Sequence, residues 1–229
     1  MRIEILADAD AVAKQAAAFI AAQARAAVAA RGRFTFAVSG GRTPWQMLRA
    51  LAKEDVPWKS VDLVQVDERV APAGDSSRNL THIQESLLQY VPLPADVVYA
   101  MPVNSSDLEA GAAQYAAVLQ KIAGHPPVLD LVHLGLGPDG HTASLIPGDP
   151  VLNIADAGVA ATGVYQGHRR MTLTYPMLNR ARQILWLVTG ADKSDALRRL
   201  RDADRSIPAG RVRQDSAILL ADRAAAAAE

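Results

Sequence analysis

The residues best suited to chemistry lie in a loop near the middle of the chain. Asp139 and His141 follow an apolar run and stand among glycines in the stretch LGLGPDGHTASLIPG, which ends at Gly148. An unperturbed histidine has a pKa of about 6.5, so its ring can accept a proton near neutral pH. The sequence therefore predicts a general base at His141, with Asp139 to orient the ring. Two plainer interpretations fit as well: a histidine that only hydrogen-bonds the backbone, and an aspartate that caps a short helix at residues 142–145.

A glycine-rich turn, SGGRTP, begins at Ser39 and predicts an anion site. Gly40 and Gly41 free the backbone N–H groups, Arg42 adds a cation, and Thr43 is predicted to cap the helix that follows. The N-terminus of a helix carries a partial positive charge, so a phosphate fits there. An ordinary strand-to-helix turn explains the same residues. The turn is not the GxxxxGK[ST] loop of nucleotide-binding proteins.

Charged residues at further strand ends and helix starts can complete such a site. Asp67 and Arg69 follow the apolar run 61–66, Arg170 begins a predicted strand, and Lys193 lies where another helix begins. The three basic side chains can together supply cations to a phosphate. The remaining histidines lack the spacing to acidic or histidine partners that is typical of metal sites, so no metal site is predicted.

Three glycines in the central loop match the spacing of a dinucleotide-binding fingerprint. Gly135, Gly137 and Gly140 form GLGPDG, which fits the pattern GxGxxG. However, Pro138 and His141 interrupt the helix that should start there. No acidic residue ends an obvious strand about twenty residues later. A nicotinamide cofactor is therefore disfavoured.

These polar groups need a scaffold that brings several strand ends together. Apolar runs bounded by glycine, proline and polar residues predict strands at 2–6, 34–38, 61–66, 97–101, 129–136, 170–174, 184–189 and 217–220. Helical patterns lie between them, at 11–30, 43–51, 79–88 and 107–123 and from 190 onwards. Alternating strands and helices predict an α/β fold, with one doubly wound, mainly parallel sheet and helices on both faces.

The composition limits the class of protein. Lys and Arg number 24 and Asp and Glu also number 24, so no net charge favours nucleic acid or a membrane surface. The chain has no cysteine, which excludes disulfides, thiolate metal sites and a cysteine nucleophile. Its N-terminus, MRIEILADAD, resembles neither a signal peptide nor a membrane anchor. We expect a single domain over residues 1–229, in the cytoplasm.

Taken together, six segments in this order resemble the 6-phosphogluconolactonase family, which belongs with the glucosamine-6-phosphate isomerases. The segments are SGGRTP at Ser39, VDER at Val66, SSRNL at Ser76, LGLGPDGHTASLIPG at Leu134, RMTLT at Arg170 and GADK at Gly190. The resemblance implies a Rossmann-like fold and hydrolysis of 6-phospho-D-glucono-1,5-lactone to 6-phosphogluconate, without a metal or organic cofactor. The expected partner is this phosphosugar lactone alone, bound by a monomer.

The resemblance also implies roles for particular residues. It places the catalytic histidine at His141 and the phosphate contacts at Gly40, Gly41, Arg42 and Thr43. It places basic substrate contacts at Arg69, Arg170 and Lys193. Asp67 and Asp139 match acidic positions near the sugar. The isomerases resemble this chain but carry a glutamate five residues after the histidine, where this chain has Ile146. An isomerase needs that acid/base group, so a lactonase is favoured. A noncatalytic phosphosugar-binding protein would not need His141.

Overall fold

The computed structural model describes residues 1–227 of the chain, and the last two positions of the expected domain lie outside the described residues. Its centre is a seven-stranded sheet in the order β1-β10-β9-β6-β2-β3-β5, in which every pair of neighbours is parallel. The strands are β1 (Arg2–Leu6), β2 (Phe34–Val38), β3 (Val61–Gln65), β5 (Val98–Tyr99), β6 (Leu131–Gly135), β9 (Gln183–Val188) and β10 (Ala217–Asp222). This arrangement confirms the predicted fold class.

The central strands are apolar throughout because both faces of the sheet are covered. On β9, Ile184 and Trp186 belong to one apolar core, whereas Leu185 and Leu187 belong to the other. Successive side chains of a strand point to opposite faces, so a continuous apolar run serves two cores at once.

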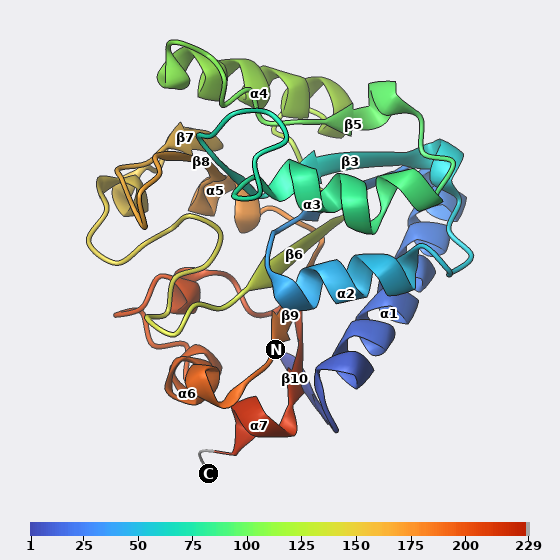
Figure 1. Cartoon of the computed structure of the whole chain (residues 1–229), viewed down its shortest axis with the longest axis vertical. Coiled ribbons are helices and arrows are strands. Elements are labelled where there is room, and N and C mark those ends of the chain that lie inside the picture. Colours follow the sequence, from blue (N-terminus) through green and yellow to red (C-terminus); the bar gives the residue numbers. More distant parts are fainter. Residues whose placement is uncertain (228–229) are drawn as a thin grey trace.

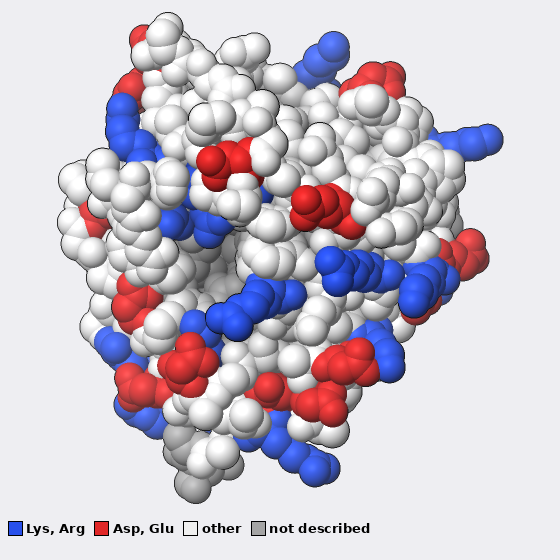
Figure 2. Space-filling model, in the orientation of Figure 1, with Lys and Arg blue, Asp and Glu red and all other residues white. Residues whose placement is uncertain are grey.

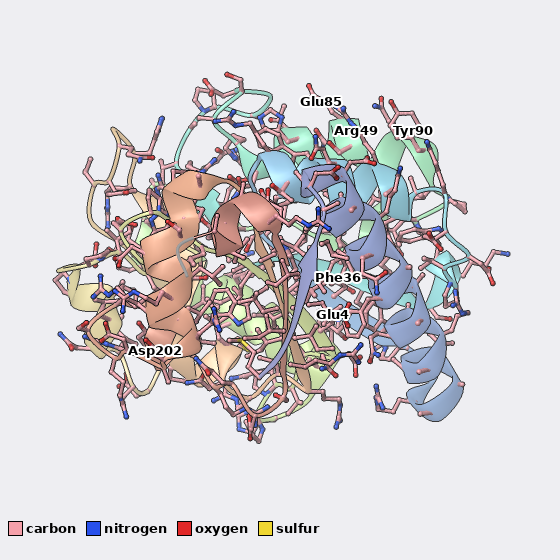
Figure 3. All side chains as sticks on the ribbon, turned by 90° about the horizontal axis from the view of Figure 1, so that it is seen from below. Glu4, Phe36, Arg49, Glu85, Tyr90 and Asp202 are labelled. Atoms are coloured by element: carbon pink, nitrogen blue, oxygen red, sulfur yellow. The ribbon has the colours of Figure 1, made fainter. Side chains whose placement is uncertain are left out.

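Helices form the two outer layers. The first core contains side chains of α4 (Leu108–Ala123), α5 (Tyr175–Leu178), α6 (Ser194–Arg201) and α7 (Arg223–Ala226), and the second contains those of α1 (Ala9–Arg31), α2 (Arg42–Leu51) and α3 (Asn79–Ser86). Figure 1 shows α1 and α2 side by side, and Figure 3 shows α1 and α6 on opposite sides of the sheet. Single-turn 3₁₀ helices occur at Trp58–Ser60, Leu88–Tyr90, Ala95–Val97, Pro150–Asn153, Ala191–Lys193 and Ala209–Arg211. Within residues 1–227, no helix is both long and apolar enough to cross a membrane.

Capping residues explain where the long helix α1 begins and ends. The Asp8 carboxylate accepts a hydrogen bond from the Ala11 N–H at 2.9 Å, and Gly32 ends the helix with φ of 78°. Alanines dominate the buried face of α1, so this helix packs closely on the sheet.

A second, smaller sheet was not indicated by the sequence. It consists of β4 (Asp67–Arg69), β8 (Arg170–Leu173) and β7 (Val159–Ala161), which pair antiparallel in that order. The strand at 170–174 was predicted, but as part of the one main sheet, whereas β4 and β7 have three residues each and are too short for a clear alternating pattern. The sheet sets Arg69 directly opposite Arg170.

Candidate active site

A crevice opens at the carboxyl ends of β2, β6 and β9, where ligands bind in open α/β sheets. It has two adjoining parts, of about 200 and about 500 Å³, which share five lining residues: Gly40, Gly41, Gly135, Leu136 and Lys193. Figure 2 shows a hollow beside the start of α2, bordered by lysine and arginine side chains. The crevice is therefore large enough for a small molecule. Basic side chains gather at its rim, although the larger part is also lined by Asp192, which pairs with Lys193 at 3.1 Å, and by Asp222.

The structure brings the residues singled out in the sequence to this crevice. The smaller part is lined by Asp67, Arg69, His141 and Arg170, the larger part by Arg42 and Thr43, and both parts by Gly40, Gly41 and Lys193. Asp139 does not line either part. It contacts the His141 ring instead.

Asp139 and His141 form a hydrogen-bonded dyad. One oxygen of the Asp139 carboxylate lies 2.6 Å from His141 Nδ1 and also accepts the His141 backbone N–H at 3.1 Å. A Cβ at Gly137 would lie 2.1 Å from His141 Nδ1, so only glycine allows the dyad to fold over this position. With Nδ1 bonded to the carboxylate, Nε2 is the ring atom left for a reacting group. No helix forms at residues 142–145, so the interpretation of Asp139 as a helix cap is wrong.

The surroundings of Asp139 stabilise its charged form. Partial burial acts to raise the pKa of Asp139, but the His141 ring, the His141 backbone N–H and the Tyr165 hydroxyl together outweigh burial and lower this pKa. Asp139 is therefore ionised near neutral pH and can hold the ring in one orientation.

Asp67 is held by two buried side chains that sequence reasoning had not selected. One carboxylate oxygen accepts a hydrogen bond from Asn79 Nδ2 at 3.2 Å, and the other accepts one from Ser144 Oγ at 2.7 Å. The Asn79 carboxamide also packs against Gly40, where an added Cβ would lie 1.8 Å from Asn79 Oδ1. Asn79 thus connects the Asp67 carboxylate with the glycine-rich turn. Asn79 lies within the segment SSRNL, whereas nothing in the sequence relates Ser144 to Asp67.

Arg69 and Arg170 form a pair of like charges on the small sheet. They face each other across β4 and β8, and Arg170 is 4% exposed. Their Nε atoms are buried and have no hydrogen-bond partner among the described residues. Burial, and then the charge of Arg69, lower the pKa of Arg170. Two close cations with unused donors are costly without a ligand, so this arrangement favours an anion.

The glycine-rich turn differs from its predicted geometry. Gly41, with φ of 128°, is the N-cap of α2, and no side chain caps this helix. Thr43 lies inside the helix, and its hydroxyl is 2.6 Å from the Thr189 hydroxyl, so the prediction of Thr43 as N-cap is wrong. An uncapped N-terminus with no acidic residue in its first turn leaves N–H groups available to an anion.

His133 fixes the start of this turn from inside the sheet. Its Nδ1 accepts the Ser39 N–H at 3.2 Å, while the Ser39 hydroxyl donates to the His133 carbonyl at 2.9 Å. Complete burial lowers the pKa of His133 to about 3. The ring is therefore neutral and structural.

This buried histidine makes stability depend on pH. The unfolded chain binds a proton at His133 near pH 6.5, whereas the folded protein excludes it down to about pH 3, so stability falls as the pH drops below 6.5. His133→Asn keeps an acceptor for Ser39 and removes the titration. We expect the wild type to lose about 2 kcal/mol more free energy of unfolding than this variant between pH 7 and pH 5. Urea unfolding at both pH values measures the difference, and equal losses would contradict the account.

Tyr165 is a further residue that the sequence did not point to. Its hydroxyl donates to Asp139 at 3.1 Å, and its ring lies below the Arg170 guanidinium at 5.1 Å. It belongs to an irregular segment without a recognisable motif, so only the folded structure relates it to the site.

Comparison with known proteins gives consistent results. A family model described as glucosamine-6-phosphate isomerases/6-phosphogluconolactonase matches residues 7–220. A 6-phosphogluconolactonase of Synechocystis is 39% identical over 167 residues, which are 71% of this chain and 69% of that protein. A 6-phosphogluconolactonase of Mycobacterium tuberculosis is 36% identical over 239 residues, covering 98% of this chain and 97% of that protein. The crystal structure of a 6-phosphogluconolactonase from Shewanella baltica superposes with a TM-score of 0.85 at 27% identity, covering 97% of both chains.

Proposed function

Because this chain belongs to the glucosamine-6-phosphate isomerase/6-phosphogluconolactonase family, we propose that it is a 6-phosphogluconolactonase of the oxidative pentose phosphate pathway. Its reaction is the hydrolysis of 6-phospho-D-glucono-1,5-lactone to 6-phospho-D-gluconate. One observation carries the proposal for this particular site: His141, hydrogen-bonded to Asp139, lines a small cavity together with the buried Arg170 and the half-buried Arg69, whose Nε donors are unused. The dyad suits proton transfer, and the arginines suit an anionic substrate.

The substrate phosphate is anchored first. The N–H groups at the uncapped start of α2 and the side chains of Arg170 and Lys193 converge on the crevice and supply donors and positive charge. Anchoring the phosphate holds the lactone C1 carbonyl near His141, so binding energy is converted into orientation.

Water then attacks the C1 carbonyl. His141, neutral and oriented by Asp139, takes a proton from the water as its oxygen bonds to C1, and the carbonyl oxygen becomes an oxyanion. Arg69 and N–H groups of the glycine-rich loops stabilise this oxyanion. The C1–O bond of the ring then breaks, and the ring oxygen takes the proton from the His141 imidazolium. The product is the open-chain acid, and His141 is neutral again.

A covalent serine intermediate is disfavoured by the hydrogen bonds of the two nearby serines. The Ser144 hydroxyl is completely buried and donates to Asp67, and the Ser39 hydroxyl donates to the His133 carbonyl. Neither hydroxyl is bonded to the His141 ring, which is the base that a serine nucleophile would need.

An isomerase reaction is disfavoured by residue 146. The isomerases, which this family includes, use a carboxylate there to open the sugar ring and move protons. Here Ile146 is buried, at 7% exposed, and lies outside the lining of the crevice. The acid/base group that such a reaction requires is missing at this position.

Two parallel assays test the proposed function. Proton release is followed after adding fresh 6-phosphogluconolactone, with the spontaneous rate subtracted, and ammonia release is followed with glucosamine 6-phosphate. We expect acceleration in the first assay and none in the second. No acceleration in the first assay, by protein shown to be folded, would overturn the proposal.

The proposed contact of Lys193 with the substrate phosphate can be tested separately. Lys193→Met removes one charged donor, which is expected to lower kcat/KM for the phosphorylated lactone roughly 10- to 150-fold, mainly through KM. The activity on unphosphorylated gluconolactone should change little, because that substrate has no group for Lys193 to bind. Steady-state kinetics on both lactones measure the effect, with the exposed Lys121→Met as the control. Equal losses on both lactones would contradict a phosphate-binding role.

A further inference from the structure

Tyr165 is presented to the site by a tight turn. The Tyr165 N–H donates to the His168 carbonyl at 2.9 Å, and the His168 N–H donates back to the Tyr165 carbonyl at 3.2 Å. The two residues between them, Gln166 and Gly167, have φ of 50° and 83°, as in the two-residue turns that match the twist of paired strands. A glutamine in the left-handed region is unusual, and the two backbone hydrogen bonds between Tyr165 and His168 close the turn around it.

The hydroxyl of Tyr165 completes the hydrogen bonding of the dyad. It donates to Asp139 Oδ2 at 3.1 Å, while Oδ1 of the same carboxylate bonds to the His141 ring at 2.6 Å. The Tyr165 ring meets the His141 ring edge-on, with centroids 5.6 Å apart. Both carboxylate oxygens therefore have a partner, and the imidazole has an aromatic neighbour that limits its rotation.

The same residue also supports the cationic side of the cavity. The Arg170 guanidinium lies over the Tyr165 ring at 5.1 Å, and Arg170 Nη2 donates to the Tyr165 carbonyl at 3.4 Å. A cation over an aromatic face is attracted by the ring. Tyr165 therefore contacts both the base dyad and an arginine of the anion site, which come from different parts of the chain.

We propose that Tyr165 is a positioning residue that holds the Asp139–His141 dyad and Arg170 in a fixed relation to each other. This inference rests on the proposed lactonase function of the site. Tyr165 itself does not line the cavity, so it acts through Asp139 and Arg170. Its hydroxyl orients the carboxylate and moderates its basicity, and its ring supports the guanidinium.

The electrostatic environment agrees with this geometry. Burial, and then the charge of Asp139 and its hydrogen bond, raise the pKa of Tyr165, so its hydroxyl keeps the proton that it donates. The Tyr165 hydroxyl is one of the groups that lower the pKa of Asp139. The other charged groups facing the dyad across the cavity are Asp67 and Arg69 on β4, Arg170 on β8 and Lys193 before α6.

Tyr165→Phe separates the two roles, because it removes the hydroxyl and keeps the ring. The carboxylate loses a donor and becomes more basic, so it stabilises the His141 imidazolium more strongly. We expect the acid limb of the kcat/KM profile to move up by about half a pH unit and kcat to fall about fivefold, with KM little changed. Tyr165→Leu also removes the ring and should raise KM for the phosphorylated lactone by a further 2- to 30-fold, as an approximate range for a lost cation–π contact.

A matched control is Tyr175→Phe. The Tyr175 hydroxyl also makes one hydrogen bond in a partly buried place, to the Pro208 carbonyl at 2.9 Å, and its partner is neither residue of the dyad. Its pH profile should equal that of the wild type. If the pH profiles of the Tyr175 and Tyr165 variants changed equally, the positioning role would be overturned, because equal changes would reflect a general loss of stability.

A second readout needs no substrate. In protein with ¹³C-labelled aspartate carboxyl groups, NMR follows the titration of Asp139, and its pKa should rise in Tyr165→Phe and stay unchanged in Tyr175→Phe. An unchanged Asp139 titration would overturn the inference even in an active enzyme. A wild type without lactonase activity would overturn the proposed function. The carboxyl titration would still show whether the Tyr165 hydroxyl lowers the pKa of Asp139.

Discussion

His141→Asn is expected to lower kcat for 6-phosphogluconolactone about 10²- to 10⁴-fold. Asparagine can occupy the place of the ring and hydrogen-bond to Asp139, but it cannot accept a proton from water near neutral pH. Because the phosphate anchor is untouched, KM should change little. Proton-release kinetics, corrected for spontaneous hydrolysis, measure the loss.

The control for this variant is His125→Asn, which changes an exposed histidine outside both parts of the crevice. It should retain wild-type kinetics. If folded His141→Asn protein also retained wild-type turnover, His141 would not be the base, and the mechanism proposed for the dyad would be wrong.

Glu68→Gln is expected to lower the free energy of unfolding by about 3–5 kcal/mol, because it leaves a buried cation without its counter-ion. Glu68 is completely buried, and one of its oxygens lies 3.1 Å from Arg78 Nε in an ion pair. Its carboxylate also accepts hydrogen bonds from several other groups, namely Gln65 Nε2 and the backbone N–H groups of Arg69, Asn79 and Leu80. Every neighbour is a donor, so the –NH₂ group of a glutamine would face another donor.

Glu68 also lies next to residues of the candidate site. The same carboxylate connects the backbone of Arg69 with the first residues of α3, where Asn79 contacts Asp67. Urea unfolding measures the change, with the exposed Glu109→Gln as the matched control. Glu109 also forms an ion pair, with Arg169 at 2.7 Å, but its loss should cost no more than about 1 kcal/mol. If the two variants lost similar amounts of unfolding free energy, Glu68 would not be the essential counter-ion and hydrogen-bond acceptor described here.

Much of the scaffold could be predicted because its signals are local. The strand at Phe34–Val38 has the predicted bounds, since an apolar run ends sharply at polar residues on both sides. Asp107 caps α4, where an acidic residue precedes the helical pattern. In the glycine-rich turn, by contrast, the helix begins at Arg42, one residue before Thr43. Its N-cap is Gly41, which has no side chain to form a capping hydrogen bond, so the sequence pattern for a helix start is absent there.

The site was predictable to the extent that its residues follow strands of one parallel sheet. Carboxyl ends of such strands meet at one edge, so the glycine-rich turn and the central loop were expected close together. The Asp139–His141 contact is also local in sequence. The small sheet, however, depends on pairing between residues about a hundred positions apart, as for Arg69 and Arg170. The contacts of Ser144 with Asp67 and of Tyr165 with Asp139 are likewise long-range, and no local pattern encodes them.

A lactonase of the kind proposed needs a phosphate anchor and a histidine base in one crevice. This combination is tested by the ratio of kcat/KM for 6-phosphogluconolactone to kcat/KM for unphosphorylated gluconolactone, measured with the wild type by proton release. With two charged donors on the phosphate, the expected ratio is roughly 10² to 10⁴, an estimate that follows from the usual strength of such bonds. A ratio near one, or no acceleration of the phosphorylated lactone above its spontaneous rate, would contradict the proposal.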